Sequence, residues 1–123
     1  MGVATYRDHL ASVKREIREI SPKEAAQKLA AGPRPVLLDV RERDEWEQGH
    51  IPGAIHIPRG NLESRIDNAV PDRNASVIVY CAAGNRSAYA AKTLAELGFG
   101  DVLSISGGFS QWKQNGHEWK LPR

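Results

Sequence analysis

The sequence contains little cysteine, no long apolar run and no large excess of either positive or negative charge. Each of these shortages excludes a class of protein. One cysteine, Cys81, stands among 123 residues, so no disulfide can form within the chain and a disulfide-stapled scaffold is excluded. No stretch approaches the roughly 20 apolar residues that a membrane-spanning helix needs. The 17 basic and 15 acidic side chains are interspersed and leave a net charge of +2, unlike the clustered basic face of a nucleic-acid-binding protein.

The length of the chain is sufficient for one compact domain. A chain of 123 residues buries about two-thirds of its unfolded surface on folding, so a core can form without cross-links. Its first 20 residues, MGVATYRDHLASVKREIREI, lack the apolar centre of a secretion signal, and together with the cysteine usage this predicts a cytoplasmic protein. The slight basic excess favours small anions or acidic partners, and we expect neither nucleic acid nor a membrane as partner.

Apolar runs of strand length alternate with helical patterns along the whole chain. The expected strands are VLLDV at 36–40, AIHI at 54–57, SVIVY at 76–80, DVLSI at 101–105 and a short segment at 18–20. Helices are expected at 22–31, 41–48, 61–66, 87–97 and 109–114. Such alternation predicts an α/β fold, with parallel strands, right-handed crossovers and helices on both faces of the sheet. Ligands of such sheets bind at the carboxyl ends of the strands.

The N-terminal segment, residues 1–16, is predicted to be an amphipathic helix that precedes a main domain of residues 17–123. Thr5 with Asp8 can cap this helix. Its apolar face is made of Tyr6, Leu10, Val13 and Ile17. We favour packing of this face onto the chain's own domain, and a docking helix for a partner is the alternative.

The single cysteine directly follows an expected strand, in the stretch VIVYCAAGNRSAYAAK. A lone cysteine there is usually a small buried hydrophobe, but the residues after it favour chemistry. Gly84 and Asn85 tolerate positive φ, so the loop can turn its backbone N–H groups inward as an anion nest. The following helix adds N–H groups, and Arg86 adds a forked positive charge. These features favour the thiolate over the thiol and predict that Cys81 is a nucleophile beside a bound anion.

Three blocks of the sequence, in order, resemble the rhodanese family of sulfurtransferases in its single-domain form: LLDVRERDEWEQGHIPGAIHIP, VIVYCAAGNRSAYAAKTLAELGF and VLSISGGFSQW. The resemblance covers about residues 17–112 and implies a five-stranded parallel sheet flanked by helices. It also implies that Cys81 takes up sulfur as a persulfide and that Arg86 orients the loop and binds the donor's anionic end. The family signature Cys-x-x-Gly-x-Arg-Ser/Ala is matched at Cys81, Gly84, Arg86 and Ser87.

The resemblance implies a double displacement, in which sulfur passes from a donor such as thiosulfate to cyanide, a thiol or a sulfur-carrier protein. Asn85 is either a turn former or a substrate contact, and Arg59, after a strand end, either attracts the anion or is a solvated surface residue. The residues expected to bind substrate are therefore Ala82, Ala83, Gly84, Asn85, Arg86, Ser87 and Arg59.

The length of the loop between Cys81 and Arg86 distinguishes sulfur transfer from the alternative reactions of this fold class. Phosphatases and arsenate reductases of the same fold class place one residue more between the cysteine and the arginine than the four found here. A shorter loop forms a tighter nest, which suits one outer sulfur better than a phosphate ester. A thiosulfate sulfurtransferase is therefore predicted, with a cysteine-based phosphatase or arsenate reductase and a non-catalytic interaction module as alternatives.

Other polar residues are expected to support the site rather than react. Asp39 and Arg41 follow the strand at 36–40 and are expected to form a buried or half-buried ion pair. His50, within GHIPGA, is expected to make a structural hydrogen bond that ties the turn. The four histidines do not show metal-ligand spacing, so neither a metal nor an organic cofactor is expected.

Overall fold

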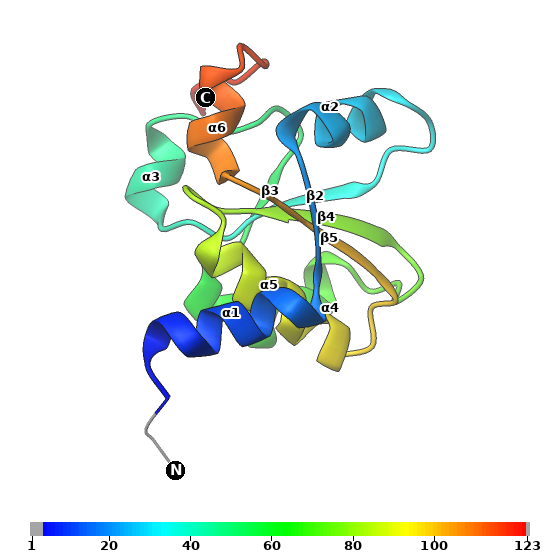
Figure 1. Cartoon of the computed structure of the whole chain (residues 1–123). Coiled ribbons are helices and arrows are strands. Elements are labelled where there is room, and N and C mark those ends of the chain that lie inside the picture. Colours follow the sequence, from blue (N-terminus) through cyan, green and yellow to red (C-terminus); the bar gives the residue numbers. More distant parts are fainter. Residues whose placement is uncertain (1–3, 123) are drawn as a thin grey trace.

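The computed structural model describes residues 4–122, which fold around a five-stranded parallel sheet (Figure 1). The strands are β1 (Arg18–Ile20), β2 (Val36–Asp39), β3 (Ile55–His56), β4 (Ser76–Tyr80) and β5 (Asp101–Ile105), in the spatial order β1-β5-β4-β2-β3. The central strand β4 pairs with β2 through Ile78 and Leu37 and with β5 through Ile78 and Leu103. The predicted α/β fold and its five parallel strands are confirmed.

Helices cover both faces of the sheet, as predicted. They are α1 (Tyr6–Glu16), α2 (Pro22–Ala30), α3 (Arg43–Glu47), the 3₁₀ turn η1 (Arg59–Asn61), α4 (Leu62–Ala69), α5 (Asn85–Glu96) and α6 (Gly108–Gln114). Helices α1, α4 and α5 lie on one side of the sheet, and α2 and α6 lie on the other (Figure 1). No helix within residues 4–122 is long and apolar enough to cross a membrane.

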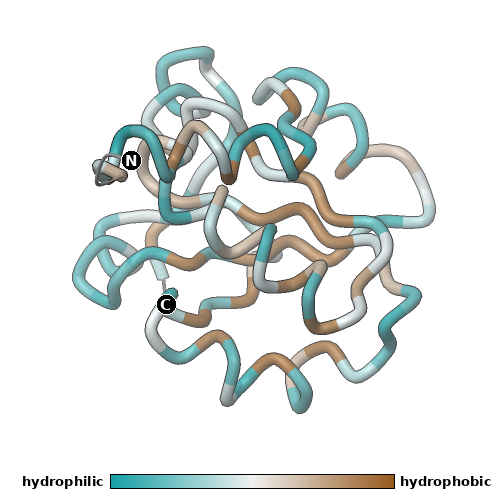
Figure 2. The backbone as a smooth tube through the Cα atoms, turned by 60° about the horizontal axis from the view of Figure 1, so that its bottom comes forward, coloured by the Kyte–Doolittle hydropathy of each residue, from teal (hydrophilic) through white to brown (hydrophobic). Residues whose placement is uncertain are grey.

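The central strand is apolar on both faces because each face meets a helical layer. Val77 and Val79 pack with residues of α4 and α5, whereas Ile78 and Tyr80 pack with residues of α2 and α6. All four side chains are at most 1% exposed, and the strands form the continuous apolar centre of the molecule (Figure 2). This burial fixes the register of β4 and hence the point at which the following loop leaves the sheet.

Local capping explains where the first helices begin. The N–H of Asp8 donates to Thr5 Oγ1 over 3.1 Å, and the N–H of Glu24 donates to Ser21 Oγ over 3.1 Å. Glu24 Oε1 accepts in return from the N–H of Ser21, which completes a capping box. The cap of α1 is the one predicted from Thr5 and Asp8.

Helix α1 packs against α5 of the same chain. Val13 is 1% exposed, Glu16 pairs with Lys92 of α5, and His9 Nδ1 lies 2.8 Å from the Tyr89 hydroxyl. Tyr6 stacks on Tyr89 yet remains 63% exposed, so the apolar face is buried only along part of its length. The predicted N-terminal segment begins at residue 1 and the predicted main domain ends at residue 123. Residues 1–3 and 123 lie outside the part of the chain that the structure describes.

The observed elements differ from the expected ones mainly at their ends. Strand β3 has two residues, Ile55–His56, and the helix expected at 61–66 is α4, which runs from Leu62 to Ala69 after η1. The C-terminal tail, for which the sequence shows no pattern, is held by a bridge in which the N–H of His50 donates to Lys120 O over 2.8 Å. Such long-range pairing leaves no local signature in the sequence.

Candidate active site

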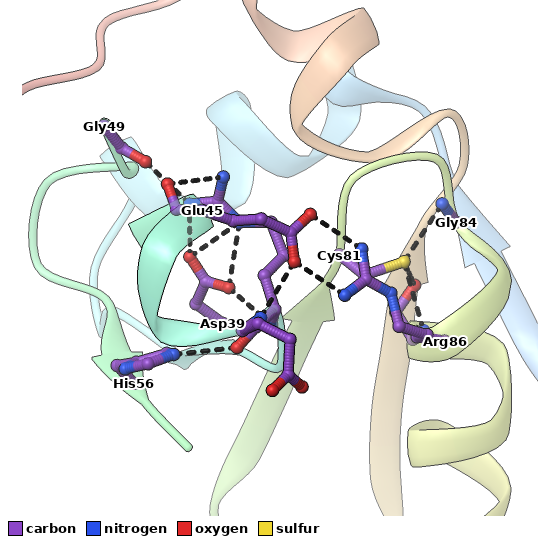
Figure 3. Close-up of polar contacts among 10 residues, drawn as sticks. Asp39, Glu45, Gly49, His56, Cys81, Gly84 and Arg86 are labelled. Carbon is purple, nitrogen blue, oxygen red and sulfur yellow. Dashed lines mark hydrogen bonds and ion pairs between the residues drawn. The ribbon is translucent and has the colours of Figure 1, made fainter. Parts of the chain in front are cut away.

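Cys81 lies between the end of β4 and the start of α5, with its sulfur turned toward backbone amides. The sulfur accepts hydrogen bonds from the N–H of Gly84 over 3.1 Å and from the N–H of Ser87 over 3.3 Å (Figure 3). Gly84 has φ 101°, a left-handed conformation that glycine adopts without steric cost and that curls the loop around the sulfur. Cys81 is 1% exposed, so these two backbone amides reach a sulfur that is shielded from solvent.

Further amides of the loop have no hydrogen-bond acceptor among residues 4–122. They are the backbone N–H groups of Ala82, Ala83, Asn85 and Arg86. Ala83 is exposed at the crest of the loop, and Ala82 and Asn85 are half-buried. Asn85 and Arg86 also open α5, where N–H groups carry the positive end of the helix dipole. The loop therefore offers more amide donors than the resting sulfur uses.

The start of α6 holds the backbone of this loop from the other side. The N–H of Phe109 donates to Cys81 O over 2.8 Å, and the N–H of Ser110 donates to Ala82 O over 3.0 Å. A Cβ atom at Gly108 would collide with Cys81 O, and Gly108 has φ 58°. Glycine is therefore required at 108 on two counts. The sequence predicted the helix at 109–114 but not this contact between its start and the cysteine loop.

Arg86 is fixed by a carboxylate that the sequence reasoning missed. Its Nη1 and Nη2 donate to Glu45 Oε1 and Oε2 over 2.7 and 2.9 Å, and Figure 3 shows the two groups pointing at each other. The hydrogen bond from Arg86 lowers the pKa of Glu45 to about 2. The same bond raises the pKa of Arg86 above its ordinary value, and the nearby Cys81 adds to that rise. The only sequence signal was a carboxylate on the short helix that follows β2.

Asp39 and Arg41 form a buried ion pair next to this arrangement. The Arg41 Nη2 donates to Asp39 Oδ2 over 2.7 Å, and the Arg41 backbone N–H donates to Asp39 Oδ1 over 2.9 Å. The two residues are 3% and 0% exposed. Although burial opposes the charged form, the hydrogen bond and charge of Asp39 raise the pKa of Arg41 above its ordinary value.

Arg41 also joins three elements around the site. Its Nη2 donates to Gly49 O over 2.7 Å, after the end of α3, and its guanidinium lies 4.3 Å from the centre of the Phe109 ring on α6. Because α3 carries Glu45, Arg41 helps to set the position of the carboxylate that holds Arg86.

His50 lies in the turn after α3 and is 4% exposed. Its Nδ1 is 3.0 Å from Ile51 O, and its ring stacks on Trp46 with 3.7 Å between ring centres. Its backbone also forms the bridge to Lys120. These contacts are structural, and none of them involves the cysteine loop.

Arg59 forms its side-chain hydrogen bonds outside the cysteine loop. Its Nη1 donates to both carboxylate oxygens of Glu63 over 3.2 Å, and its Nη2 donates to Thr93 Oγ1 over 3.0 Å. These bonds tie η1 to α4 and α5, and no hydrogen bond joins Arg59 to residues 81–87. Between residues 4 and 122, no group of three or more His, Cys, Asp or Glu side chains is arranged to hold a metal ion.

Comparison with curated proteins identifies relatives over most of the chain. The thiosulfate sulfurtransferase GlpE of Pseudomonas entomophila (strain L48) is 39% identical over 98 residues, which are 80% of this chain and 86% of that protein. YrkF of Bacillus subtilis (strain 168) is 35% identical over 105 residues, 85% of this chain. The matched part is 56% of YrkF, so the chain spans little more than half of that relative.

Solved structures with the same fold match nearly the whole length of this chain. The polysulfide-sulfur transferase homodimer from Wolinella succinogenes superposes with a TM-score of 0.84 at 31% identity, over 97% of this chain and 89% of that chain. RPA3614 from Rhodopseudomonas palustris CGA009, of unknown function and described as a possible tyrosine phosphatase, superposes with a TM-score of 0.85 at 29% identity, over 98% and 99% of the two chains. Residues 21–115 match the family described as Rhodanese-like domain. The chain belongs to the rhodanese family.

Proposed function

We propose that the protein is a sulfurtransferase that moves sulfane sulfur from a donor such as thiosulfate to a nucleophilic acceptor through a persulfide on Cys81. The observation that carries this proposal is the sulfur of Cys81, which accepts two backbone N–H bonds while four further amides of the same loop have no acceptor among residues 4–122. The names of relatives agree with it, since GlpE is a thiosulfate sulfurtransferase and the W. succinogenes protein transfers polysulfide sulfur.

The first displacement takes the outer sulfur from the donor. The Cys81 thiolate attacks the sulfane sulfur of thiosulfate, a new S–S bond forms, and the S–S bond of thiosulfate breaks with its electron pair leaving on sulfite. The charges balance, because a thiolate and a dianion become a persulfide anion and sulfite. Arg86, held by Glu45 over 2.7 and 2.9 Å, is positioned to attract the oxyanion end of the donor.

The persulfide places negative charge one bond further from the protein. The amides of Ala83, Asn85 and Arg86 can donate to this outer sulfur, while those of Gly84 and Ser87 continue to donate to Sγ. A loop with four residues between Cys81 and Arg86 leaves room for one added atom rather than for a tetrahedral ester. The loop thus stabilises both anions of the cycle without a cofactor.

The second displacement regenerates the enzyme. An acceptor, which is cyanide in an assay and a thiol or sulfur-carrier protein in a cell, attacks the outer sulfur, and the S–S bond breaks with its electrons returning to the Cys81 thiolate. The proposal includes a reducing compartment such as the cytoplasm, because oxidation of the single thiol would end the cycle.

Steady-state assays test this proposal and separate it from phosphatase activity. Thiocyanate formation from thiosulfate and cyanide is expected in the parent and should fall by at least about 1000-fold in Cys81→Ser, as for loss of a nucleophile. Ser64→Ala, on exposed α4, is the control and should retain full activity. Hydrolysis of an aryl phosphate that is faster than thiocyanate formation and depends on Cys81 would replace the proposal with the chemistry suggested for RPA3614.

A further inference from the structure

Two buried hydroxyl groups lie behind the sulfur and have no place in the mechanism above. Ser87 Oγ is 3.5 Å from Cys81 Sγ, and Ser104 Oγ donates to Ser87 Oγ over 2.8 Å. Both serines are 0% exposed. The two hydroxyls therefore form a chain that ends at the reacting atom and is shielded from water.

The position of Ser104 in β5 makes the hydroxyl unusual. Alternate residues of a strand face the same layer, and Val102, two residues earlier, belongs to the apolar core under α5 together with Cys81 and Val79. An apolar side chain is the ordinary occupant of such a position, because burying a hydroxyl costs free energy unless it is hydrogen-bonded. Ser104 avoids that cost by its bond to Ser87.

The hydrogen count decides the direction of the chain when the sulfur is ionised. A hydroxyl has one hydrogen to donate and can accept others. When Ser104 donates to Ser87, the hydrogen of Ser87 remains free, and a thiolate 3.5 Å away is an acceptor within its reach. In the thiol form, the S–H group donates to Ser87 Oγ instead. When the thiol proton is lost to solvent, rotation of the Ser87 hydroxyl is enough to present its hydrogen to the thiolate.

We propose that Ser104 is a positioning residue for the sulfur chemistry: it directs the Ser87 hydroxyl to donate to the Cys81 thiolate. A hydroxyl that accepts one hydrogen bond becomes a stronger donor in the next. Ser104 therefore stabilises the anionic sulfur without touching substrate. This inference rests on the proposed role of Cys81 as a thiolate nucleophile.

The charged groups around the sulfur do not substitute for this chain. Arg86 of α5 is paired with Glu45 of α3, and Asp39 and Arg41 at the end of β2 form their own ion pair. Tyr80 packs in the cluster on the opposite face of the sheet. Among the described side chains, Ser87 of α5 is the one whose hydroxyl forms a hydrogen bond with the sulfur, and Ser104 of β5 donates to that hydroxyl.

The test is the pH dependence of Cys81 alkylation by iodoacetamide in the full chain. Cys81 is the only cysteine, so the rate reports this sulfur alone and does not depend on sulfur transfer. Ser104→Ala is expected to move the acid limb of the profile upward and to slow alkylation about 3-fold on that limb, as for a weakened hydrogen bond to a charged group. Ser104→Thr keeps the hydroxyl and should restore the parent profile.

A double variant distinguishes a relay from two independent effects. Ser87→Ala is expected to slow alkylation on the acid limb about 10-fold, because the donor itself is lost. If Ser104 acts through Ser87, adding Ser104→Ala to Ser87→Ala produces no further change. Additive effects of the two substitutions, or a Ser104→Ala profile that superimposes on the parent, would overturn the inference.

Val102→Ala is the control for loss of buried atoms on the same face of β5. It should lower stability and leave the alkylation profile unchanged, whereas a shift equal to that of Ser104→Ala would mean that packing alone is responsible. If the chain transfers no sulfur but the serine variants behave as expected, the proposed function fails and the positioning role stands. If sulfur is transferred and the profiles do not move, only the positioning role fails.

Discussion

At the scale of single residues, Arg86 and Glu45 have to be considered together. The guanidinium and carboxylate make two parallel bonds of 2.7 and 2.9 Å, a geometry that orients Arg86 more strictly than a single contact would. Removing the arginine therefore has two consequences: the donor loses its cation, and Glu45 is left as an unpaired anion near the sulfur.

Arg86→Ala is predicted to reduce kcat/KM for thiosulfate about 100-fold, a size that suits loss of a charge-assisted contact together with repulsion from Glu45. The acid limb of the rate profile should also move to higher pH. Adding Glu45→Gln to that variant is expected to recover part of the loss, because the unpaired charge is removed. Steady-state kinetics across pH measure both effects, and a double variant no better than Arg86→Ala would show that Glu45 exerts no repulsion.

Gly108 is the second residue on which the site depends. Gly108→Ala is predicted to destabilise the fold by about 2–4 kcal/mol, because it combines a left-handed backbone with a clash against the Cys81 carbonyl. Gly116→Ala is the matched control, since Gly116 also has positive φ but has open space around its Cβ position, and it should cost only about 1–2 kcal/mol. Chemical denaturation measures both. Equal losses in the two variants would argue against the close contact.

At the scale of elements, the loop is a junction of β4, α5, α3 and α6. Its sulfur accepts hydrogen bonds from the amides of Gly84 in the loop and Ser87 in α5. Its arginine is held by Glu45 of α3, and its backbone carbonyls accept from amides at the start of α6. The Asp39–Arg41 pair joins β2 to the turn after α3 and to Phe109. The geometry of the sulfur site is therefore a property of how these elements pack, which local propensity does not determine.

Asp39→Asn is predicted to be the most damaging conservative change in this junction. It leaves Arg41 charged, buried and without its anion, a situation that typically costs about 3–5 kcal/mol. Thermal and chemical unfolding should both show the loss, and thiosulfate turnover should fall because α3 no longer holds Glu45 firmly. A loss below about 1 kcal/mol would mean that water or other groups replace the pair. Arg43→Gln, on the exposed face of α3, is the control.

Helix α1 contributes to the stability of the same layer. Val13 is 1% exposed against α5, so Val13→Ala is expected to cost about 2–3 kcal/mol for the buried methyl groups and the space they leave. Tyr6→Ala, at a side chain that is 63% exposed, should cost much less. Urea unfolding compares the two. Similar losses would show that α1 is held by its exposed aromatic cluster rather than by its buried face.

At the scale of the whole molecule, acid should weaken the fold partly through Glu45. Its pKa in the folded protein is about 2, below its ordinary value of 4.5, so its contribution is complete above about pH 4.5 and is lost as the pH falls toward 2. The difference in unfolding free energy between the parent and Glu45→Gln should therefore shrink across that window. A difference that stays constant from pH 6 to pH 2 would contradict the assigned ion pair.

The sequence predicted the parallel sheet and the helices on both its faces, because the strands and helices have clear periodicities and caps. The cap that Thr5 forms with the N–H of Asp8 is an example in which a local pattern was sufficient. The nest after Cys81 was predicted from Gly84 and its neighbours for the same reason, since a loop of consecutive residues determines its own turn.

Contacts between distant residues could not be predicted in this way. Glu45 is 41 residues from Arg86, and Ser104 is 17 residues from Ser87. Nothing in their own surroundings in the sequence indicates a partner, because the partner is chosen by sheet register and helix packing. Arg59 shows the converse: an arginine that follows a strand end bonds to α4 and α5 instead of to the cysteine loop.

Intact-mass spectrometry of the full chain after incubation with thiosulfate tests the central claim most directly. We predict a gain of one sulfur atom on Cys81, complete loss of that atom on addition of cyanide, and no gain in Cys81→Ser. A parent protein that stays at its unmodified mass under conditions in which its thiol is reduced would contradict the claim that this loop holds a persulfide.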